Sequence, residues 1–379
     1  MKLIALFLGI VAGVALLSAL SMRLWGGAPE KTEETRAIIM QPDMTVTEFA
    51  AANRLPEEVI TQAFALASPQ DAEKRLREFG RDDAQIVQRV QAAFVFYQEE
   101  HSKNWVKILL KFIAWGAFLL LMFRLTRKAA VTDKNRLLFY GASALLFGVI
   151  LGADPNPMGT IKDAIALYAL KGVIFPPRLI ACAVLLTTVL LANKFICAWG
   201  CQFGVLQDLL FRLNKGKSGL LKPYKPPFVV TNAIRIAVFI GFTGVAFLWS
   251  FDLLGHVDPF KIYNPVALTL TSGAFIGLLL LASLFVYRPW CHCFCPFGLA
   301  GWLVEKFSVF NIKVNYQTCT ACNACAKACP STVMDAILKQ NRVIPDCFSC
   351  SSCINVCPTH SIRFDSGKRE MPPEQKFAA

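Results

Sequence analysis

The chain has 379 residues, of which 55% are hydrophobic and 17% charged, and 39 Lys and Arg against 26 Asp and Glu give a formal net charge of +13. A mean hydropathy of +0.47 excludes a disordered chain and is typical of a membrane protein. We expect no nucleic-acid partner, because basic loops that face anionic lipid account for the positive charge.

An apolar run at the start of the chain, Leu3–Met22, is long enough for one membrane span. Residues 1–25 therefore form either an uncleaved anchor, which the length of the run favours, or a secretory signal peptide with a cleavage site near Ala19 and Ser21. Five further spans are predicted, and they are Trp105–Leu125, Leu137–Leu151, Leu179–Phe195, Phe228–Trp249 and Val266–Tyr287.

The loops after the second and fourth spans are rich in Lys and Arg, with Arg127, Lys128, Lys215 and Lys217 among them. The loops between them are poorer in these residues, so the positive-inside rule puts the rich loops in the cytoplasm. Six spans then place both the N-terminus and the C-terminal tail in the cytoplasm. We expect a multi-pass protein of a bacterial inner membrane, surrounded by membrane lipid.

A polar segment, residues 26–104, separates the first two spans and is expected to form a small extracytoplasmic domain of three or four short helices. Pro56 suits the first position of one helix, and Ser68 with Asp71 suits a capped helix start. A helix is predicted to end at Gly80, and a further helix from Asp82 could run into the second span. The segment is interpreted either as a spacer or as a docking surface for a partner.

The predicted membrane core, residues 105–309, contains a repeat. Each unit pairs two spans around an Asp-Pro loop, at Asp154-Pro155 and Asp258-Pro259, and ends in C-x3-C-x-F-G. The motif cysteines are Cys197, Cys201, Cys291 and Cys295. Because residues i and i+4 share a helix face, two such ends would aim four thiols at a common point. We interpret them as reactive thiols that hold a further metal centre or form a thiol relay, with buried structural thiols as the alternative. Cys182 and Cys293 are interpreted as packing residues.

Eight cysteines near the C-terminus form two C-x2-C-x2-C-x3-C-P runs, the spacing with which bacterial ferredoxins hold two [4Fe–4S] clusters. The fourth ligand of each cluster comes from the other run. One set is Cys319, Cys322, Cys325 and Cys357, and the other is Cys347, Cys350, Cys353 and Cys329. Zinc is the weaker alternative, since it needs two cysteine pairs and not eight cysteines in a doubled pattern.

The ferredoxin domain is predicted over residues 310–366, with a polar tail at 367–379. Short strands are expected at 311–314, 342–344 and 361–364. We expect no haem, since the four histidines, His101, His256, His292 and His360, all lie outside the centres of the spans. Electron transfer across the whole bilayer would therefore need a partner subunit. His292, between candidate ligand cysteines, is interpreted as a hydrogen-bonding partner.

The paired C-x3-C motifs beside membrane spans, followed by two ferredoxin runs, resemble the NapH/NosR group of membrane ferredoxin-type proteins over roughly Leu137–Asp365. The resemblance implies electron transfer between the quinone pool and periplasmic reductases, or support of metalloenzyme maturation. Two features depart from the group. Gln202 stands where the group usually has proline, which could alter the turn after Cys201. The extracytoplasmic segment is also too small for a flavin domain and carries no S-G-A-T motif, so we expect no covalent flavin.

The sequence thus predicts an α-helical membrane protein of about six spans, with a cytoplasmic α+β two-cluster ferredoxin domain and a small extracytoplasmic helical domain. The leading function is an iron–sulfur electron-transfer subunit of a quinol dehydrogenase-type oxidoreductase, which exchanges electrons with quinone and with a partner redox protein or respiratory complex subunit. The alternatives are a maturation or metal-reduction factor and a non-redox assembly scaffold.

Overall fold

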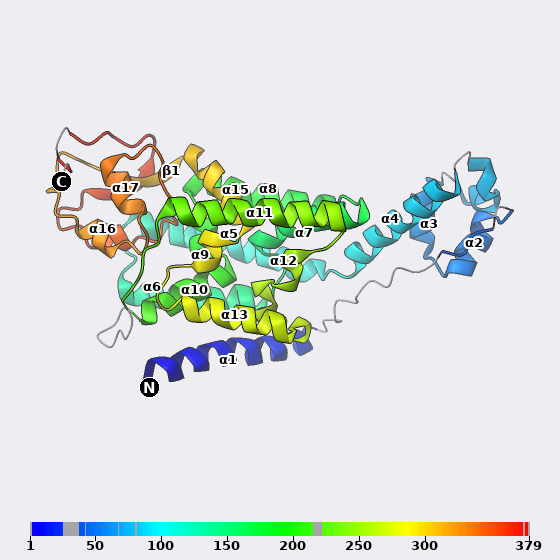
Figure 1. Cartoon of the computed structure of the whole chain (residues 1–379), viewed down its shortest axis with the longest axis horizontal. Coiled ribbons are helices and arrows are strands. Elements are labelled where there is room, and N and C mark those ends of the chain that lie inside the picture. The colour runs from blue at the N-terminus through cyan, green and yellow to red at the C-terminus, as the bar shows by residue number, and fades with distance from the viewer. Residues whose placement is uncertain are drawn as a thin grey trace.

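The computed structural model describes residues 2–25, 38–41, 43–66, 68–79, 82–214, 222–373 and 376–377. The protein is mostly helical and elongated, with a helical bundle in the middle (Figure 1). A ferredoxin-like domain lies at one end of the bundle, which we call the ferredoxin end, and a small helical domain lies at the opposite end. Gly80, Lys215 and Lys217, which carried predictions above, lie outside the described residues.

The bundle consists of long helices that run along the axis of the molecule. They are α1 (Lys2–Leu24), α5 (Trp105–Arg127), α6 (Asp133–Ser143) with its π-helical continuation η3 (Ala144–Ile150), α7 (Pro157–Lys171), α8 (Pro176–Ala192), α11 (Phe228–Trp249) and α13 (Leu270–Ala282). Among the described helices, α1, α5 and α11 are long and apolar enough to cross a membrane, and α8 and α13 are shorter apolar helices. Large apolar side chains such as Leu109, Leu248 and Leu270 are exposed on the bundle. An apolar surface of this extent is typical of a membrane protein.

Three span predictions need correction at their ends. The fourth span begins at Pro176, because its two prolines occupy the first helical turn, where no backbone N–H is needed. The sixth is shorter than predicted, since residues 265–267 form a separate 3₁₀ turn before α13. The third begins earlier than predicted, at Asp133, and changes from α-helix to π-helix at Ala144.

The predicted loop at Asp154-Pro155 contains a helix that the sequence analysis missed. Asn156 caps α7 by accepting a hydrogen bond from the Gly159 N–H at 2.8 Å, and Pro157 follows at the first helical position. Gly172 ends the helix with a φ of 67°, a conformation that glycine adopts without strain. α7 packs against α8, α11 and α15 (Pro296–Val304) inside the bundle. Asn-Pro before the helix and Lys-Gly at its end were the available signals.

The small helical domain at the end opposite the ferredoxin domain has its own core, built around Phe49, Val59, Phe64 and Ile86. Its elements are α2 (Val46–Asn53), α3 (Glu57–Phe64), two 3₁₀ helices (Pro69–Glu73 and Leu76–Phe79) and α4 (Asp83–His101). The capping box at Ser68 and Asp71 is present, although it begins a 3₁₀ helix, and Pro56 is the N-cap of α3. α4 and α5 are separate helices, because the chain leaves the helix at residues 102–104.

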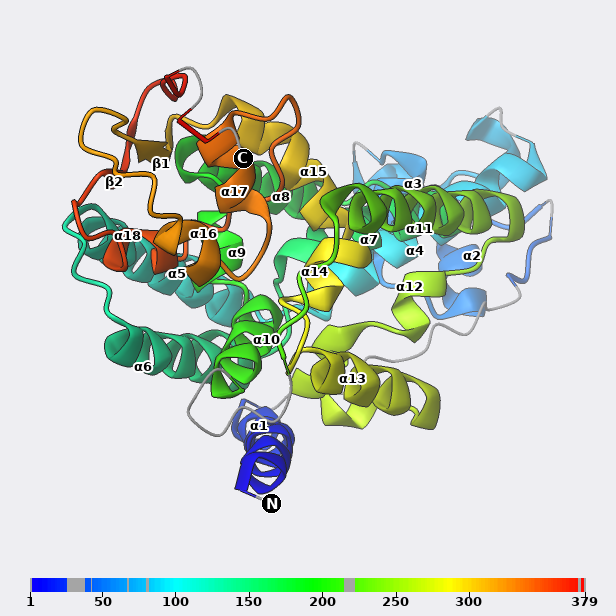
Figure 2. The ribbon, with the colours of Figure 1, turned by 60° about the vertical axis from the view of Figure 1, so that its left-hand side comes forward.

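The ferredoxin-like domain contains one antiparallel strand pair, β1 (Phe310–Val314) and β2 (Ile362–Ser366), with Ile312 opposite Phe364. Its short helices are α16 (Ala324–Ala328), α17 (Val333–Lys339) and α18 (Ser352–Asn355). The strand predicted at 342–344 is absent, and Ile344 instead accepts a hydrogen bond from the Trp302 indole through its backbone carbonyl. Figure 2 shows this domain packed over the bundle near α5 and α9 (Phe195–Trp199).

Candidate metal centres

Three cavities are each lined by four cysteines, and their volumes are about 10, 20 and 20 Å³. The four-cysteine cavity of the bundle is lined by Cys197, Cys201, Cys291 and Cys295. The bundle-side ferredoxin cavity is lined by Cys329, Cys347, Cys350 and Cys353. The surface-side ferredoxin cavity is lined by Cys319, Cys322, Cys325 and Cys357. These are the sets that the spacing predicts, with one cysteine exchanged between the two ferredoxin runs.

The cysteine side chains surround each cavity instead of meeting at one point. Among the described residues, no group of three or more His, Cys, Asp or Glu side chains is close enough to hold a single metal ion. A [4Fe–4S] cluster has four iron corners, so its ligands stand around it. Four thiol donors per cavity match the ligand set of such a cluster in each of the three places.

In the ferredoxin domain, neighbouring groups favour the thiolate form of two cysteines. Burial works to raise the pKa of Cys350, but the guanidinium groups of Arg212 and Arg136 outweigh it, so the pKa lies below its ordinary value. The pKa of Cys357 is also lowered: burial opposes the shift, and hydrogen bonds from Thr359 and from the Ser361 backbone carry it. Burial, reinforced by the Glu305 carboxylate and opposed by Arg369, raises the pKa of Cys347 to about 12, but a bound metal deprotonates a coordinating thiol.

The four-cysteine cavity lies where the two repeat units meet. Each motif forms a short helix, a break and a second helix: α9 then α10 (Gln202–Leu213) in the first unit, and α14 (Pro289–Cys293) then α15 in the second. The expectation that each cysteine pair shares one helix face is therefore wrong, because Cys201 and Cys295 are N-caps of the second helices. The sulfur atoms still line one cavity, because the chain turns at the break and brings the second helix of each motif back against the first.

The four thiols have nearly equal surroundings. Their exposed fractions are 7, 7, 7 and 8%, and the rest of the lining includes the aromatic side chains of Phe203, Phe260, Trp290 and Phe297. The backbone angles of Cys201 (φ −74°, ψ 110°) and Cys295 (φ −73°, ψ 118°) are almost the same. The two units thus present their cysteines in matching conformations.

The departure at Gln202 leaves this turn unchanged. Gln202 and Pro296 both take the first helical position, where the backbone N–H has no partner inside the helix. The Gln202 side-chain amide instead donates to the Ala153 carbonyl at 2.8 Å, and the backbone carbonyl of Gln202 accepts from the Tyr263 hydroxyl at 2.9 Å. Glutamine here ties the motif to the loop before α7, which proline could not do.

Two buried arginines hold the carbonyls of the first cysteines. Arg288 donates to the carbonyls of Cys197 and Ala198 and pairs with Asp208 at 2.8 Å. Arg235 donates to the Cys291 carbonyl at 3.2 Å. Buried arginine needs an anionic partner, which is Asp208 for Arg288 and Asp346 of the ferredoxin domain for Arg235.

The glycine that ends each motif is required by close packing. A Cβ on Gly298 would lie 2.7 Å from the Cys291 carbonyl oxygen, and one on Gly204 would lie 3.0 Å from the Cys197 carbonyl oxygen. The helix after each break can approach the helix before it only without a side chain at this position.

We predict that Gly298→Ala destabilises the protein by about 1–3 kcal/mol, because a backbone atom must move to admit the methyl group. Gly277→Ala is the matched control, since a Cβ there meets nothing within 4 Å and alanine favours the helix by roughly 0.5–1 kcal/mol. Denaturation midpoints and iron content of the two variants measure the difference. Equal midpoints would show that the motif tolerates a side chain at this glycine.

A buried cluster of charges joins the four-cysteine cavity to the ferredoxin domain. Asp346, directly before Cys347, accepts from Arg235 at 2.9 Å and from Lys194, and all three side chains are fully buried. Burial works to raise the pKa of Asp346, but Lys194 and Arg235 hold it well below its ordinary value. His292 Nδ1 lies 3.5 Å from the same carboxylate, so the interpretation of His292 as a polar partner is consistent with its position.

Phe348, the next residue after Cys347, forms part of the wall of both the four-cysteine cavity and the bundle-side ferredoxin cavity. The Arg288 guanidinium lies 4.7 Å from its ring centre. Sequence reasoning missed Phe348, Asp346 and the two arginines. The available signal for Asp346 and Phe348 was their position on either side of Cys347.

Comparisons with known proteins find iron–sulfur domains in the segments that contain these cysteines. A 4Fe-4S dicluster domain matches residues 311–371, and a 4Fe-4S binding domain matches twice, at residues 173–220 and 268–315. The second model thus matches once in each repeat unit and includes both C-x3-C motifs. No solved structure matches the chain significantly.

Similar curated proteins are found in several bacteria. YccM of Escherichia coli K12, whose name assigns it to electron transport, is 29% identical over 170 residues, or 41% of this chain and 46% of YccM. The methylamine utilization ferredoxin-type protein MauN of Paracoccus denitrificans is 27% identical over 50% of this chain and 65% of MauN. The regulatory protein NosR of Pseudomonas aeruginosa is 28% identical over 35% of this chain and 19% of NosR.

The chain spans about half the length of YccM, so the matches do not extend to the whole of that protein. The two iron–sulfur family models cover the C-x3-C motifs and the ferredoxin domain. The chain therefore carries iron–sulfur domains and is similar, over 35–50% of its length, to YccM, to the ferredoxin-type protein MauN and to NosR.

Proposed function

We propose that the protein exchanges electrons with the membrane quinone pool and passes them along three iron–sulfur centres to or from a partner oxidoreductase. The observation that carries this proposal is the row of three four-cysteine cavities of similar size. The four-cysteine cavity and the bundle-side ferredoxin cavity share the wall formed by Phe348. The two ferredoxin cavities are separated by α17, whose Ile337 lines one and whose Leu338 lines the other.

Each cavity would hold one [4Fe–4S] cluster through its four cysteines, and a bound cluster supplies one-electron exchange. The chain's own residues keep these places dry and fixed. Aromatic side chains exclude water from the four-cysteine cavity, and the Gly298 N–H donates to Cys295 Sγ at 3.3 Å. Hydrogen bonds to cysteine sulfur are one of the means by which a protein sets a cluster's potential.

We further propose that the ferredoxin end lies in the cytoplasm and that six apolar segments cross the membrane. Lys and Arg in the loops of that end support this orientation. The exposed Cys322 of the surface-side cavity then faces the cytoplasm, where a soluble partner can approach. The small helical domain would lie outside, at the other end of the bundle.

Two measurements on the purified anaerobic protein test the proposal. Iron and labile sulfide should approach about twelve per chain, whereas about eight would mean that only the ferredoxin cavities are occupied. Mixing with a soluble quinol, or mixing the reduced protein with the matching quinone, should change the cluster absorbance and the EPR signal rapidly. Intact clusters that exchange no electrons with either form would overturn the quinone part of the proposal.

A further inference from the structure

A polar pocket of about 390 Å³ lies beside the four-cysteine cavity, between the bundle and the small helical domain. We call it the junction pocket. It is lined by residues of α7, by the last turn of α4, and by the segment from α12 (Leu253–His256) through the 3₁₀ turns Pro259–Tyr263 and Pro265–Ala267. Its volume falls in the range of pockets that bind small organic molecules, roughly 300–1,000 Å³.

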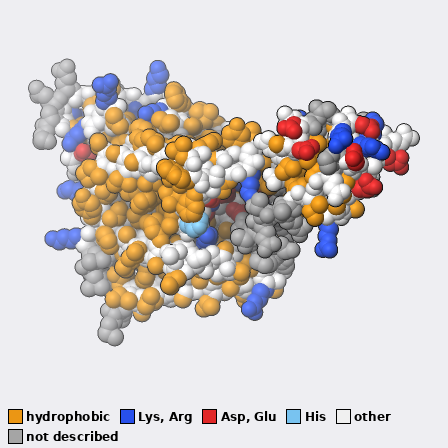
Figure 3. All heavy atoms as spheres, turned by 45° about the vertical axis from the view of Figure 1, so that its right-hand side comes forward, with side chains coloured by type: hydrophobic (Ala, Val, Ile, Leu, Met, Phe, Trp, Pro, Cys, Tyr) orange, Lys and Arg blue, Asp and Glu red, His pale blue; other side chains and the backbone are white. Residues whose placement is uncertain are grey.

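The pocket opens through an apolar surface. Figure 3 shows a hollow with histidine, acidic and basic side chains set in a broad hydrophobic face, next to the small helical domain. Exposed apolar side chains lie on the elements around it, including Trp249, Phe251, Leu253 and Val266. A ligand that enters here therefore comes from the lipid phase and needs a polar head on an apolar body.

The charges of the lining are balanced. Five Asp or Glu and five Lys or Arg side chains contribute to it, with Glu99 paired to Arg178 at 2.9 Å. Four of the five carboxylates already pair with Lys162 or Arg178, so a bound cation would have to separate existing pairs, whereas a neutral molecule with both donors and acceptors would not. A hydroquinone has this character, since each of its hydroxyl groups can donate and accept.

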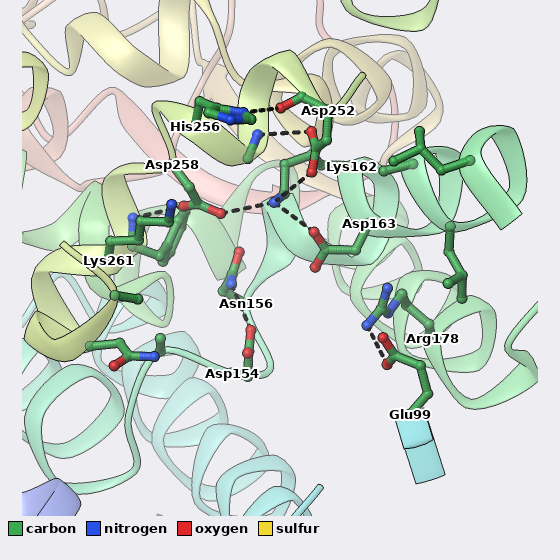
Figure 4. A pocket seen from close by; sticks show the side chains of 18 of the residues that line it. Glu99, Asp154, Asn156, Lys162, Asp163, Arg178, Asp252, His256, Asp258 and Lys261 are labelled. Carbon is green, nitrogen blue, oxygen red and sulfur yellow. Dashed lines mark hydrogen bonds and ion pairs between the residues drawn. The ribbon is translucent and has the colours of Figure 1, made fainter. Parts of the chain in front are cut away.

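Carboxylates that can accept protons lie at the base of the junction pocket. Figure 4 shows the Lys162 ammonium between three carboxylates, at 2.6 Å from Asp163, 3.1 Å from Asp258 and 3.9 Å from Asp252. Burial raises the pKa of Asp258, and Lys162 offsets this only in part. A carboxylate with a raised pKa next to an ammonium is suited to accept a proton from a phenolic hydroxyl.

Phe260 connects this pocket to the redox part of the protein, because it also lines the four-cysteine cavity. A ring bound in the junction pocket would therefore lie beside the wall of that cavity, at the end of the bundle away from the ferredoxin domain.

We propose that the junction pocket binds the head of a membrane-soluble hydroquinone, with its hydroxyl groups on the Lys162 carboxylate cluster. This inference rests on the proposed exchange with the quinone pool and places that exchange at the end of the bundle opposite the ferredoxin domain. Protons from the hydroquinone would then leave on the side of the small helical domain.

The test measures binding of decylubiquinol to the full chain in lipid nanodiscs by calorimetry. Ala267→Phe fills the pocket, and Asp258→Asn removes one carboxylate at constant volume. Both are expected to weaken binding about tenfold or more, the effect of losing a hydrogen bond to a charged group or the space for the ring. Asp43→Asn is the control, because Asp43 forms an exposed ion pair with Arg77 in the small helical domain.

Normal binding by both pocket variants, with unchanged helix content and melting, would overturn the inference, as would the absence of binding by the unmodified protein. Two results separate this inference from the proposed function. If both variants still exchange electrons rapidly with quinol, the proposed function stands, but the junction pocket is not the quinol site. Pocket-dependent binding without electron exchange would support the pocket and refute the function.

Discussion

Replacing Cys201 or Cys295 with serine is expected to remove about four of about twelve irons and to slow quinol-dependent reduction of the remaining clusters. Loss of a direct ligand should exceed the roughly 10–100-fold effect that is typical of residues that only support a ligand. The ferredoxin clusters should stay assembled, since their eight cysteines lie in separate cavities. Iron analysis, EPR and stopped-flow reduction by quinol measure the three expectations.

The chain offers matched controls for this experiment. Cys182 and Cys293 are partly buried and do not line the four-cysteine cavity. Cys182→Ser and Cys293→Ser should therefore change neither the iron content nor the rate at which quinol reduces the clusters. If the motif variants behaved like these controls, the four thiols would be packing residues.

Replacing Asp346 with asparagine is expected to cost about 3–5 kcal/mol, because the change leaves the buried cations Lys194 and Arg235 without their anion. Asparagine has nearly the same volume as aspartate, so the loss of stability reflects the removed charge and not a change in packing. The ferredoxin domain should be held less firmly on the bundle, and the bundle-side cluster should be lost faster in denaturant. The measurements are the denaturation midpoint and the decay of cluster absorbance.

Asp335→Asn is the control for this variant. Asp335 pairs with Lys339 at 3.3 Å on the surface, with side chains 52% and 42% exposed, and such pairs contribute about 0–1 kcal/mol. Equal destabilisation by the two variants would refute the role of Asp346 as an anchor.

The pH dependence of this anchor follows from the lowered pKa of Asp346. A carboxylate whose pKa is lower in the folded state contributes stability above its ordinary pKa and loses it only as pH falls toward the lowered value. Acidification from about pH 7 to about pH 5 should therefore leave the ferredoxin domain bound to the bundle.

The cysteine sets were the part of the site that could be predicted, because metal-ligand spacing is a local property of the chain. The spacing indicated which four cysteines would line each cavity, and the structure brings those sets together. The local geometry of the motifs was predicted less well. Cys197 and Cys201 were expected on one helix, but the chain breaks between them, and Gly204 shows where the second helix returns.

The helix α7 shows how a hydropathy pattern fails inside a membrane bundle. The sequence analysis counted this segment as part of a loop, whereas the fold surrounds its Lys162 with carboxylates from α7 and from the segment around α12. Intramembrane charges are tolerated where they pair or line a polar cavity, and pairing between distant segments is invisible in a local window.

By itself, the sequence determined the helical membrane character, the doubled C-x3-C motif and the two ferredoxin runs, because hydropathy, repeat and ligand spacing are properties of neighbouring residues. Only the tertiary structure decided that four of these thiols face one dry cavity and that Phe348 separates this cavity from the bundle-side ferredoxin cavity. It also decided that Asp346 of the ferredoxin domain forms ion pairs with Lys194 and Arg235 of the bundle. Those contacts join residues up to 152 positions apart, so they depend on how the helices pack and not on any local pattern.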